Sequence, residues 1–337
     1  MEIIKKNLRD ITNFIDCSFE LTSKCNFKCI HCYNGKNNTN DLNLEQISIA
    51  LHRIKELGVL ELLLTGGEIL LREDILLIID LCHKLGFKTT LYSNGSLLTE
   101  KIAKRISKYN MCIEISIYGS NEETYEAVTG SKKNYKRVLN ALHILEFYNV
   151  NFKTKSVIMN QNYNDFSNIY NMIKRFNGES GEYGDISCFI FGDQEKMNNC
   201  RLNESKTRYI LDKYEYCKTN SSKYGFCTAM KNQFAIDNRG YVNTCLGWRS
   251  ISFGSILDDD WREKIIEAAI PFRKELQNTI IKCNSCEISD YCIICPMTFY
   301  QDTGSHRKYS KESCKFAKIR KDIYESRIKQ QGKIFKD

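Results

Sequence analysis

Two spacings of apolar residues alternate along the first half of the chain. Short apolar runs typical of buried strands are followed by stretches in which apolar residues recur every three or four positions, as in amphipathic helices. The expected strands are 17–22, 59–64, 87–92, 111–117, 150–159 and 185–191. The expected helices are 44–57, 73–85, 98–108, 135–147 and 166–176. This repeat predicts an α/β fold with parallel strands joined by right-handed crossovers.

Polar and glycine-rich segments follow the expected strands. The first strand leads into a loop with three cysteines, and the next three end at Thr65-Gly66-Gly67-Glu68, Ser93-Asn94-Gly95 and Ser116-Ile117-Tyr118-Gly119. Since the carboxyl ends of parallel strands share one edge, a site is expected there. The paired glycines would let the backbone approach a ligand, although a tight strand-to-helix turn is the alternative interpretation.

The pattern changes after residue 191. Residues 192–226 are polar and irregular apart from an expected helix over 205–218. A β-hairpin is then expected, with strands 233–237 and 241–245 around a turn at Asn238-Arg239-Gly240. The predicted division is a barrel over 1–200, a bridging segment over 201–226, and a cysteine-rich domain over 227–320 with a C-terminal helix to 337.

Composition narrows the class of protein. The 337 residues are 42% hydrophobic and 27% charged, which is typical of a soluble globular protein. We expect no membrane span, no secretory signal and a cytoplasmic location, because no long apolar run occurs. The net charge of +8 is dispersed, so nucleic-acid binding is not expected, whereas an acidic peptide or an acidic electron-donor protein would suit it.

Sixteen cysteines in a cytoplasmic protein indicate metal binding rather than disulfides. Cys25, Cys29 and Cys32 lie within eight residues after the first expected strand. Three thiolates on a four-iron cluster would leave one iron open to another ligand. The alternative is zinc, since Cys29 and Cys32 have the spacing of half a zinc site, which His31 or a distant cysteine would complete.

A second set of thiols lies in the C-terminal third. Its members are Cys227, Cys245, Cys283, Cys286, Cys292, Cys295 and Cys314. Two Cys-x2-Cys pairs are a strong metal signal, with structural zinc as the second possibility, but seven thiols exceed the need of one zinc ion. Apart from Cys217, the remaining cysteines, Cys17, Cys82, Cys112, Cys188 and Cys200, are expected to be small buried hydrophobic residues, one of which could instead donate a hydrogen atom.

The spacing of Cys25, Cys29 and Cys32, followed by the aromatic Tyr33, resembles the signature of the radical SAM superfamily. The resemblance implies a partial (β/α)6 TIM-like barrel with a [4Fe–4S] cluster on these cysteines. S-adenosyl-L-methionine (SAM) would bind at the open iron and be cleaved reductively to a 5′-deoxyadenosyl radical. Tyr33 would lie against the adenine of SAM.

The resemblance also assigns SAM contacts at the strand ends. Gly66, Gly67 and Glu68 match a motif whose backbone contacts the SAM amino group, although Ile69 stands where the family usually has proline. Further matches imply that Ser93 and Asn94 lie near the ribose and methionine parts of SAM. They also imply that Ser116 and Arg137 bind its carboxylate. For Arg137 a solvated helix face is the alternative; a guanidinium suits a carboxylate because the two pair bidentately.

The C-terminal cysteines resemble the SPASM extension, which carries two auxiliary [4Fe–4S] clusters. The family connectivity assigns the first cluster to Cys227, Cys245 and Cys295. It assigns the second to four thiols, Cys283, Cys286, Cys292 and Cys314. This chain has two residues between Cys292 and Cys295 where the family usually has three. Cys217 would complete the first cluster, or one of its irons would stay open.

Both resemblances imply a peptide-modifying enzyme that installs a thioether or carbon–carbon crosslink in a ribosomally synthesised peptide. The alternatives are a peptide epimerase, a formylglycine-type sulfatase maturase, for which Leu246 replaces the usual aspartate, and a non-catalytic zinc-rich interaction module. A flavodoxin- or ferredoxin-type electron donor is expected. Only 24 residues precede Cys25, too few for a leader-binding domain, so leader recognition would be separate, absent, or supplied by residues 192–226.

Overall fold

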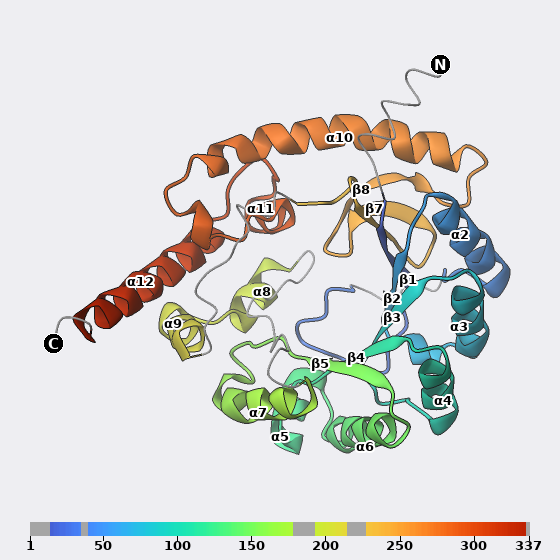
Figure 1. Ribbon diagram of the computed structural model, residues 1–337, viewed down its shortest axis with the longest axis horizontal. Coiled ribbons are helices and arrows are strands. Elements are labelled where there is room, and N and C mark those ends of the chain that lie inside the picture. Colours follow the sequence, from blue (N-terminus) through green and yellow to red (C-terminus); the bar gives the residue numbers. More distant parts are fainter. Residues whose placement is uncertain (1–13, 35–39, 178–192, 214–226, 335–337) are drawn as a thin grey trace.

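The computed structural model describes residues 14–34, 40–177, 193–213 and 227–334. Its centre is an eight-stranded sheet with the order β5-β4-β3-β2-β1-β6-β7-β8 (Figure 1). The five N-terminal strands pair in parallel, as predicted, while β6, β7 and β8 are antiparallel neighbours. The strands are β1 Asp16–Thr22, β2 Glu61–Gly66, β3 Lys88–Ser93, β4 Cys112–Ser116, β5 Asn151–Lys155, β6 Gln233–Ile236, β7 Tyr241–Cys245 and β8 Trp248–Ser255.

Helices lie around the outside of the parallel strands (Figure 1). They are α2 Leu44–Glu56, α3 Ile75–Lys84, α4 Glu100–Lys108, α5 Glu122–Thr129, α6 Lys133–Phe147 and α7 Phe166–Asn177. This arrangement confirms the predicted α/β partial barrel. The sixth expected strand, 185–191, lies outside the described residues.

Local sequence signals explain where α2 begins and ends. Asn43 Oδ1 accepts a hydrogen bond from Gln46 N at 2.9 Å, and Gln46 Oε1 accepts one from Asn43 N at 3.0 Å, which is a complete capping box. Gly58, with φ of +91°, follows the helix and allows the left-handed turn that stops it. Ile47 and Leu51 of α2 pack in the same core as Phe19 of β1.

The C-terminal hairpin extends the barrel sheet. β6 pairs in parallel with β1 from Asp16 opposite Gln233 to Phe19 opposite Ile236. The predicted hairpin and its turn are confirmed, and β8 adds a strand that the sequence analysis did not predict. The sheet is continuous across the boundaries placed at 200 and 226, so the predicted division into domains remains a proposal about folding units.

Two predicted elements have different bounds. The strand expected over 150–159 ends at Lys155, because its partner β4 ends at Ser116, which pairs with Lys155. The helix expected over 205–218 is α9 Glu204–Lys213, and the rest of that span lies outside the described residues. The predicted C-terminal helix is α12 Lys311–Ile334. Four α-helices were not predicted, namely α5 Glu122–Thr129, α8 Gln194–Cys200, α10 Trp261–Asn284 and α11 Pro296–Thr303.

No helix among the described residues is both long enough and apolar enough to cross a membrane.

Candidate active site

The loop after β1 carries three cysteines and is held by the end of α5. Lys28 N donates to Thr129 O at 3.2 Å, and Ile30 N donates to Val128 O at 3.0 Å. Inside the loop, Cys32 N donates to Cys29 O at 3.2 Å. Backbone bonds to a neighbouring helix therefore fix the path of the loop, whatever its side chains bind.

The three thiols of this loop form one electrostatic group. Burial raises the pKa of Cys25 and Cys29 above the usual range, and the neighbouring loop thiols raise both further. Cys25 Sγ accepts hydrogen bonds from Phe27 N at 3.4 Å and Asn94 Nδ2 at 3.9 Å. Three adjacent thiols with N–H donors to sulfur fit an iron–sulfur cluster, whose positive charge would stabilise the thiolates.

His31 was the nearest candidate for completing a zinc site. It is buried, and its ring packs edge-on against Tyr118 with the ring centroids 4.8 Å apart. Burial lowers its pKa to about 4, so its imidazole is neutral at physiological pH.

The two glycines after β2 pack against the chain that precedes the cysteine loop. Gly67 N donates to Thr22 O and Glu68 N to Lys24 O, both at 2.8 Å. A Cβ on Gly66 would lie 2.3 Å from Thr22 O, and one on Gly67 would lie 2.2 Å from Lys24 O. Only glycine fits this approach of two backbone segments. The amides of Gly67 and Glu68 are therefore occupied by backbone carbonyls.

Glu68 connects the end of β2 to the end of β3. Its fully buried carboxylate accepts hydrogen bonds from Leu70 N at 3.0 Å, Ser93 Oγ at 2.8 Å and Asn94 N at 2.7 Å. Burial raises its pKa. Asn94 in turn donates to Asn26 Oδ1 at 2.9 Å, inside the cysteine loop. The Glu68 carboxylate therefore positions Ser93 and Asn94 beside the thiols.

Three predicted SAM contacts lie on separate elements. Ser116 ends β4, next to Lys155 in the ladder. Arg137 is exposed on α6 and forms no ion pair with a residue that the structure describes. The Tyr33 hydroxyl is 3.5 Å from Thr65 Oγ1. The structure thus brings the predicted residues of β1, β2 and β3 together through hydrogen bonds, whereas the roles of Ser116, Arg137 and Tyr33 remain predictions.

A buried ion pair on the inner side of the sheet escaped the sequence analysis. Arg249 of β8 donates to the carboxylate of Glu20 on β1, and to Asn34 Oδ1 at 3.2 Å. Its guanidinium lies 5.5 Å from the centroid of the Tyr33 ring. Arg249 also donates to Leu246 O at 3.4 Å, beside the thiol-bearing turn at Cys245. One side chain therefore joins the cysteine loop to the second thiol region.

Glu20 predicts a pH dependence of stability. Burial raises its pKa from 4.5 to about 7, and Arg249 opposes the shift. Because the folded pKa exceeds the unfolded one, the protonated form favours folding, and stability is lost as the pH rises from about 4.5 to about 7. A pKa shift of this size corresponds to a change of about 3 kcal/mol in the free energy of unfolding. Urea unfolding across this pH window should show that the native protein loses more unfolding free energy than Glu20→Gln. Equal losses in the two proteins would contradict the assignment of the pH dependence to Glu20.

A second ion pair lies beside Ser116. Lys155 Nζ is 2.8 Å from Glu114 Oε2 and donates to the Tyr92 hydroxyl at 3.4 Å. These charged residues on strands β4 and β5 make the sheet polar on the face opposite to the helices. A charged residue within an apolar strand, such as Glu20 or Glu114, was the sequence signal for this polar face.

The C-terminal thiols fall into two groups. The first group consists of Cys227, Cys245 and Cys295, and within it neighbouring thiols raise the pKa of Cys227 and Cys245. The second group consists of Cys283, Cys286, Cys292 and Cys314, and within it neighbouring thiols raise the pKa of Cys283, Cys292 and Cys314. Mainly through burial, the pKa of Cys245 and of Cys292 rises to about 12. Thiols gathered in this way suit clusters, since bound iron would offset the cost of ionising them.

None of the described thiol groups has, as it stands, the geometry of a single-ion metal site. Cys217 and Cys188 lie outside the described residues. Cys17, Cys82 and Cys200 are buried hydrophobic residues, as predicted, and Cys112 is half-buried.

Comparisons with known proteins agree with this arrangement. Residues 19–173 match the Radical SAM superfamily. The AdoMet-dependent heme synthase of Methanosarcina barkeri is 23% identical over 329 residues, which cover 86% of this chain and 93% of that protein. AlbA, the antilisterial bacteriocin subtilosin biosynthesis protein of Bacillus subtilis, is 21% identical over 326 residues, covering 90% of this chain and 71% of AlbA.

The fold also matches a solved structure over most of its length. The structure of anSMEcpe with bound AdoMet and Cp18Cys peptide superposes with a TM-score of 0.70 at 17% identity, covering 94% of this chain and 98% of that chain. The superposition extends into the cysteine-rich C-terminal region, because it covers 94% of this chain. The match to the Radical SAM superfamily lies in the barrel, over residues 19–173.

Proposed function

We propose that this radical SAM enzyme modifies a peptide, by installing a thioether or carbon–carbon crosslink in a ribosomally synthesised precursor. The observation that carries the proposal is the three-thiol loop, which hydrogen bonds to the ends of β2 and β3 and, through Arg249, to the second thiol region. A bacteriocin biosynthesis protein among the relatives and a peptide bound to a structural neighbour support a peptide substrate.

The residues of the first site have distinct proposed tasks. Cys25, Cys29 and Cys32 would hold a [4Fe–4S] cluster that, with bound SAM, supplies a 5′-deoxyadenosyl radical able to take hydrogen from an unactivated carbon. The backbone of Gly66 and Gly67 would contact the SAM amino group. Neighbouring side chains would hold the rest of SAM, and these are Tyr33, Ser93, Asn94, Ser116 and Arg137.

Glu68 would act indirectly, because its carboxylate is used up in fixing Ser93 and Asn94. The barrel wall would shield the reacting groups from water, which prevents side reactions of a reactive intermediate.

The C-terminal thiols would hold two auxiliary [4Fe–4S] clusters, one on Cys227, Cys245 and Cys295 and the other on Cys283, Cys286, Cys292 and Cys314. Cys217 would supply a further ligand to the group of Cys227, Cys245 and Cys295. We also place the enzyme in the cytoplasm, with an external flavodoxin- or ferredoxin-type protein as the source of single electrons and a separate leader-recognition protein as a further candidate partner.

Coexpression with a short cysteine-bearing peptide encoded beside the gene tests the proposal. Mass spectrometry should find the peptide lighter by two hydrogen atoms for each crosslink, with fragmentation blocked between the joined residues. Epimerisation would leave the mass unchanged. The relationship to a heme synthase makes a tetrapyrrole the second substrate class. Conversion of iron coproporphyrin, with no change in any peptide, would overturn the peptide assignment.

A further inference from the structure

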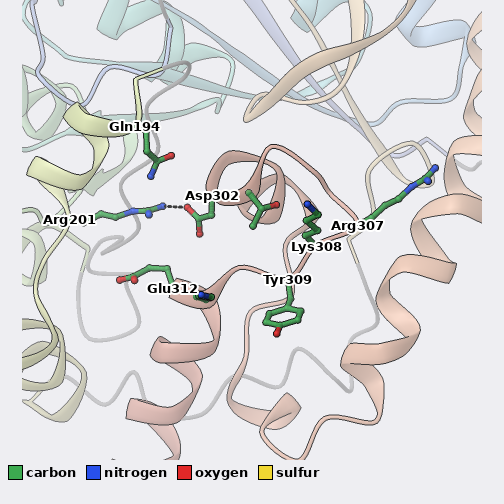
Figure 2. A pocket seen from close by; sticks show the side chains of 9 residues that line it. Gln194, Arg201, Asp302, Arg307, Lys308, Tyr309 and Glu312 are labelled. Atoms are coloured by element: carbon green, nitrogen blue, oxygen red, sulfur yellow. Dashed lines mark hydrogen bonds and ion pairs between the residues drawn. The ribbon is translucent and has the colours of Figure 1, made fainter.

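A cavity of about 670 Å³ lies between α8 and the start of α12 (Figure 2). Arg201, at the end of α8, reaches across to Asp302 of α11. The cavity therefore spans elements from both halves of the chain. Its lining consists of Gln194, Arg201, Asp302, Thr303, Arg307, Lys308, Tyr309, Lys311 and Glu312.

The acidic residues of this cavity already have cationic partners. Asp302 Oδ1 is 2.8 Å from Arg201 Nη2, and both side chains are largely buried, with 9% and 14% exposure. Glu312 pairs with Lys315 at 3.2 Å. These pairs neutralise both carboxylates that line the cavity. Neither carboxylate is therefore left to compensate the positive charge of the lysines in the lining.

Lys308 and Lys311 supply uncompensated positive charge. Both are exposed, and neither forms an ion pair with any residue in the described ranges. Arg307, the remaining cation, pairs with Glu275 at 2.8 Å outside the lining. The cavity thus has a surplus of positive charge, which attracts an anionic ligand.

The start of α12 adds to this positive potential. Ser310 Oγ accepts from Ser313 N at 3.0 Å and so caps the helix, whose first residue is Lys311. A lysine in the first turn opposes the helix dipole and costs stability. The charge at this position is therefore unfavourable for the helix alone, which is consistent with a role in binding.

We infer that this cavity docks an acidic segment of the peptide substrate, an assignment that rests on the proposed function. A concave site of this volume suits a small ligand or a short stretch of peptide. The exposed ring of Tyr309, with 65% of its surface accessible, offers an aromatic contact beside the two lysines. A folded electron-donor protein would need a broad complementary surface rather than a cavity.

Fluorescence anisotropy with a labelled peptide tests the inference without turnover. The probe is a nine-residue peptide with four glutamates, and its counterpart has glutamine at the same four positions. The native protein should bind the glutamate probe roughly tenfold more tightly than the glutamine probe at low salt, with the difference shrinking as salt rises. Lys308→Glu/Lys311→Glu should abolish the difference.

The matched control is Lys84→Glu/Lys101→Glu, which makes the same charge change on exposed lysines of α3 and α4. It should keep the preference for the glutamate probe. Glutamate at position 311 favours the helix dipole, so a loss of binding there cannot be assigned to a weakened α12. Equal binding of both probes to the native protein, or an equal effect of the control, would overturn the inference.

The same variants separate this inference from the proposed function. With a modified precursor identified, Lys308→Glu/Lys311→Glu should raise KM roughly tenfold and leave kcat nearly unchanged, because neither lysine is among the residues proposed to hold the clusters or SAM. An unchanged KM would overturn the docking inference while peptide modification stands. If no peptide is modified but the glutamate probe still binds at these lysines, the proposed function fails and the cavity remains an acidic-peptide site.

Discussion

Replacing Cys29 with alanine is expected to abolish the formation of 5′-deoxyadenosine from SAM. Cys29 lies between the other two loop thiols in sequence, and all three interact electrostatically. Two thiols cannot hold the cluster that three are proposed to hold. The measurement is chromatography of anaerobic reactions that contain SAM and a strong reductant, with product expected below the detection limit.

Cys112→Ala is the matched control for this experiment. Cys112 is a half-buried cysteine on β4 and lies outside the three proposed cluster groups. This variant should form 5′-deoxyadenosine within about twofold of the native rate, since a small buried cysteine acts as a hydrophobic residue. Formation of 5′-deoxyadenosine by Cys29→Ala at a comparable rate would show that the loop is not the site of SAM cleavage.

Replacing Cys245 with alanine is expected to stop peptide modification while SAM cleavage continues. Cys245 belongs to the first C-terminal thiol group, and burial raises its pKa to about 12. Its loss should remove about four irons per chain, the content of one cubane. The measurements are iron analysis, 5′-deoxyadenosine formation and mass spectrometry of the peptide, made on the same anaerobic preparation.

Double variants test the grouping of the thiols. Cys227→Ala/Cys245→Ala changes one group, so it should lose about four irons, whereas Cys245→Ala/Cys292→Ala changes both and should lose about eight. Equal losses in the two double variants would mean that the groups are wrongly assigned. Zinc in place of iron in every preparation would support the interaction-module alternative instead.

The barrel was predictable because its signals are local. Helix α2 shows apolar residues at helical spacing and complete capping chemistry, and each parallel strand is a short apolar run. The thiol groups were also visible as spacings. Helix α5 was not, since its eight residues contain too few apolar positions to show a period, although its last residues bond to the cysteine loop.

Longer-range features explain the other omissions. Pro271 lies within α10, and since proline usually ends a helix, a helix of 24 residues was not expected there. The Glu20–Arg249 pair joins residues far apart in the chain, and its geometry follows only from β6, β7 and β8 adding to β1. The basic cavity likewise arises where α8 meets α12, which no local pattern reveals.

The most direct test of the central assignment is electron paramagnetic resonance of the anaerobic protein after reduction. The account predicts a reduced [4Fe–4S] signal that shifts when SAM is added, because SAM would bind the iron left open by Cys25, Cys29 and Cys32. The shift should be absent in Cys29→Ala and present in Cys112→Ala. A signal that ignores SAM, or no reducible cluster at all, would contradict the account.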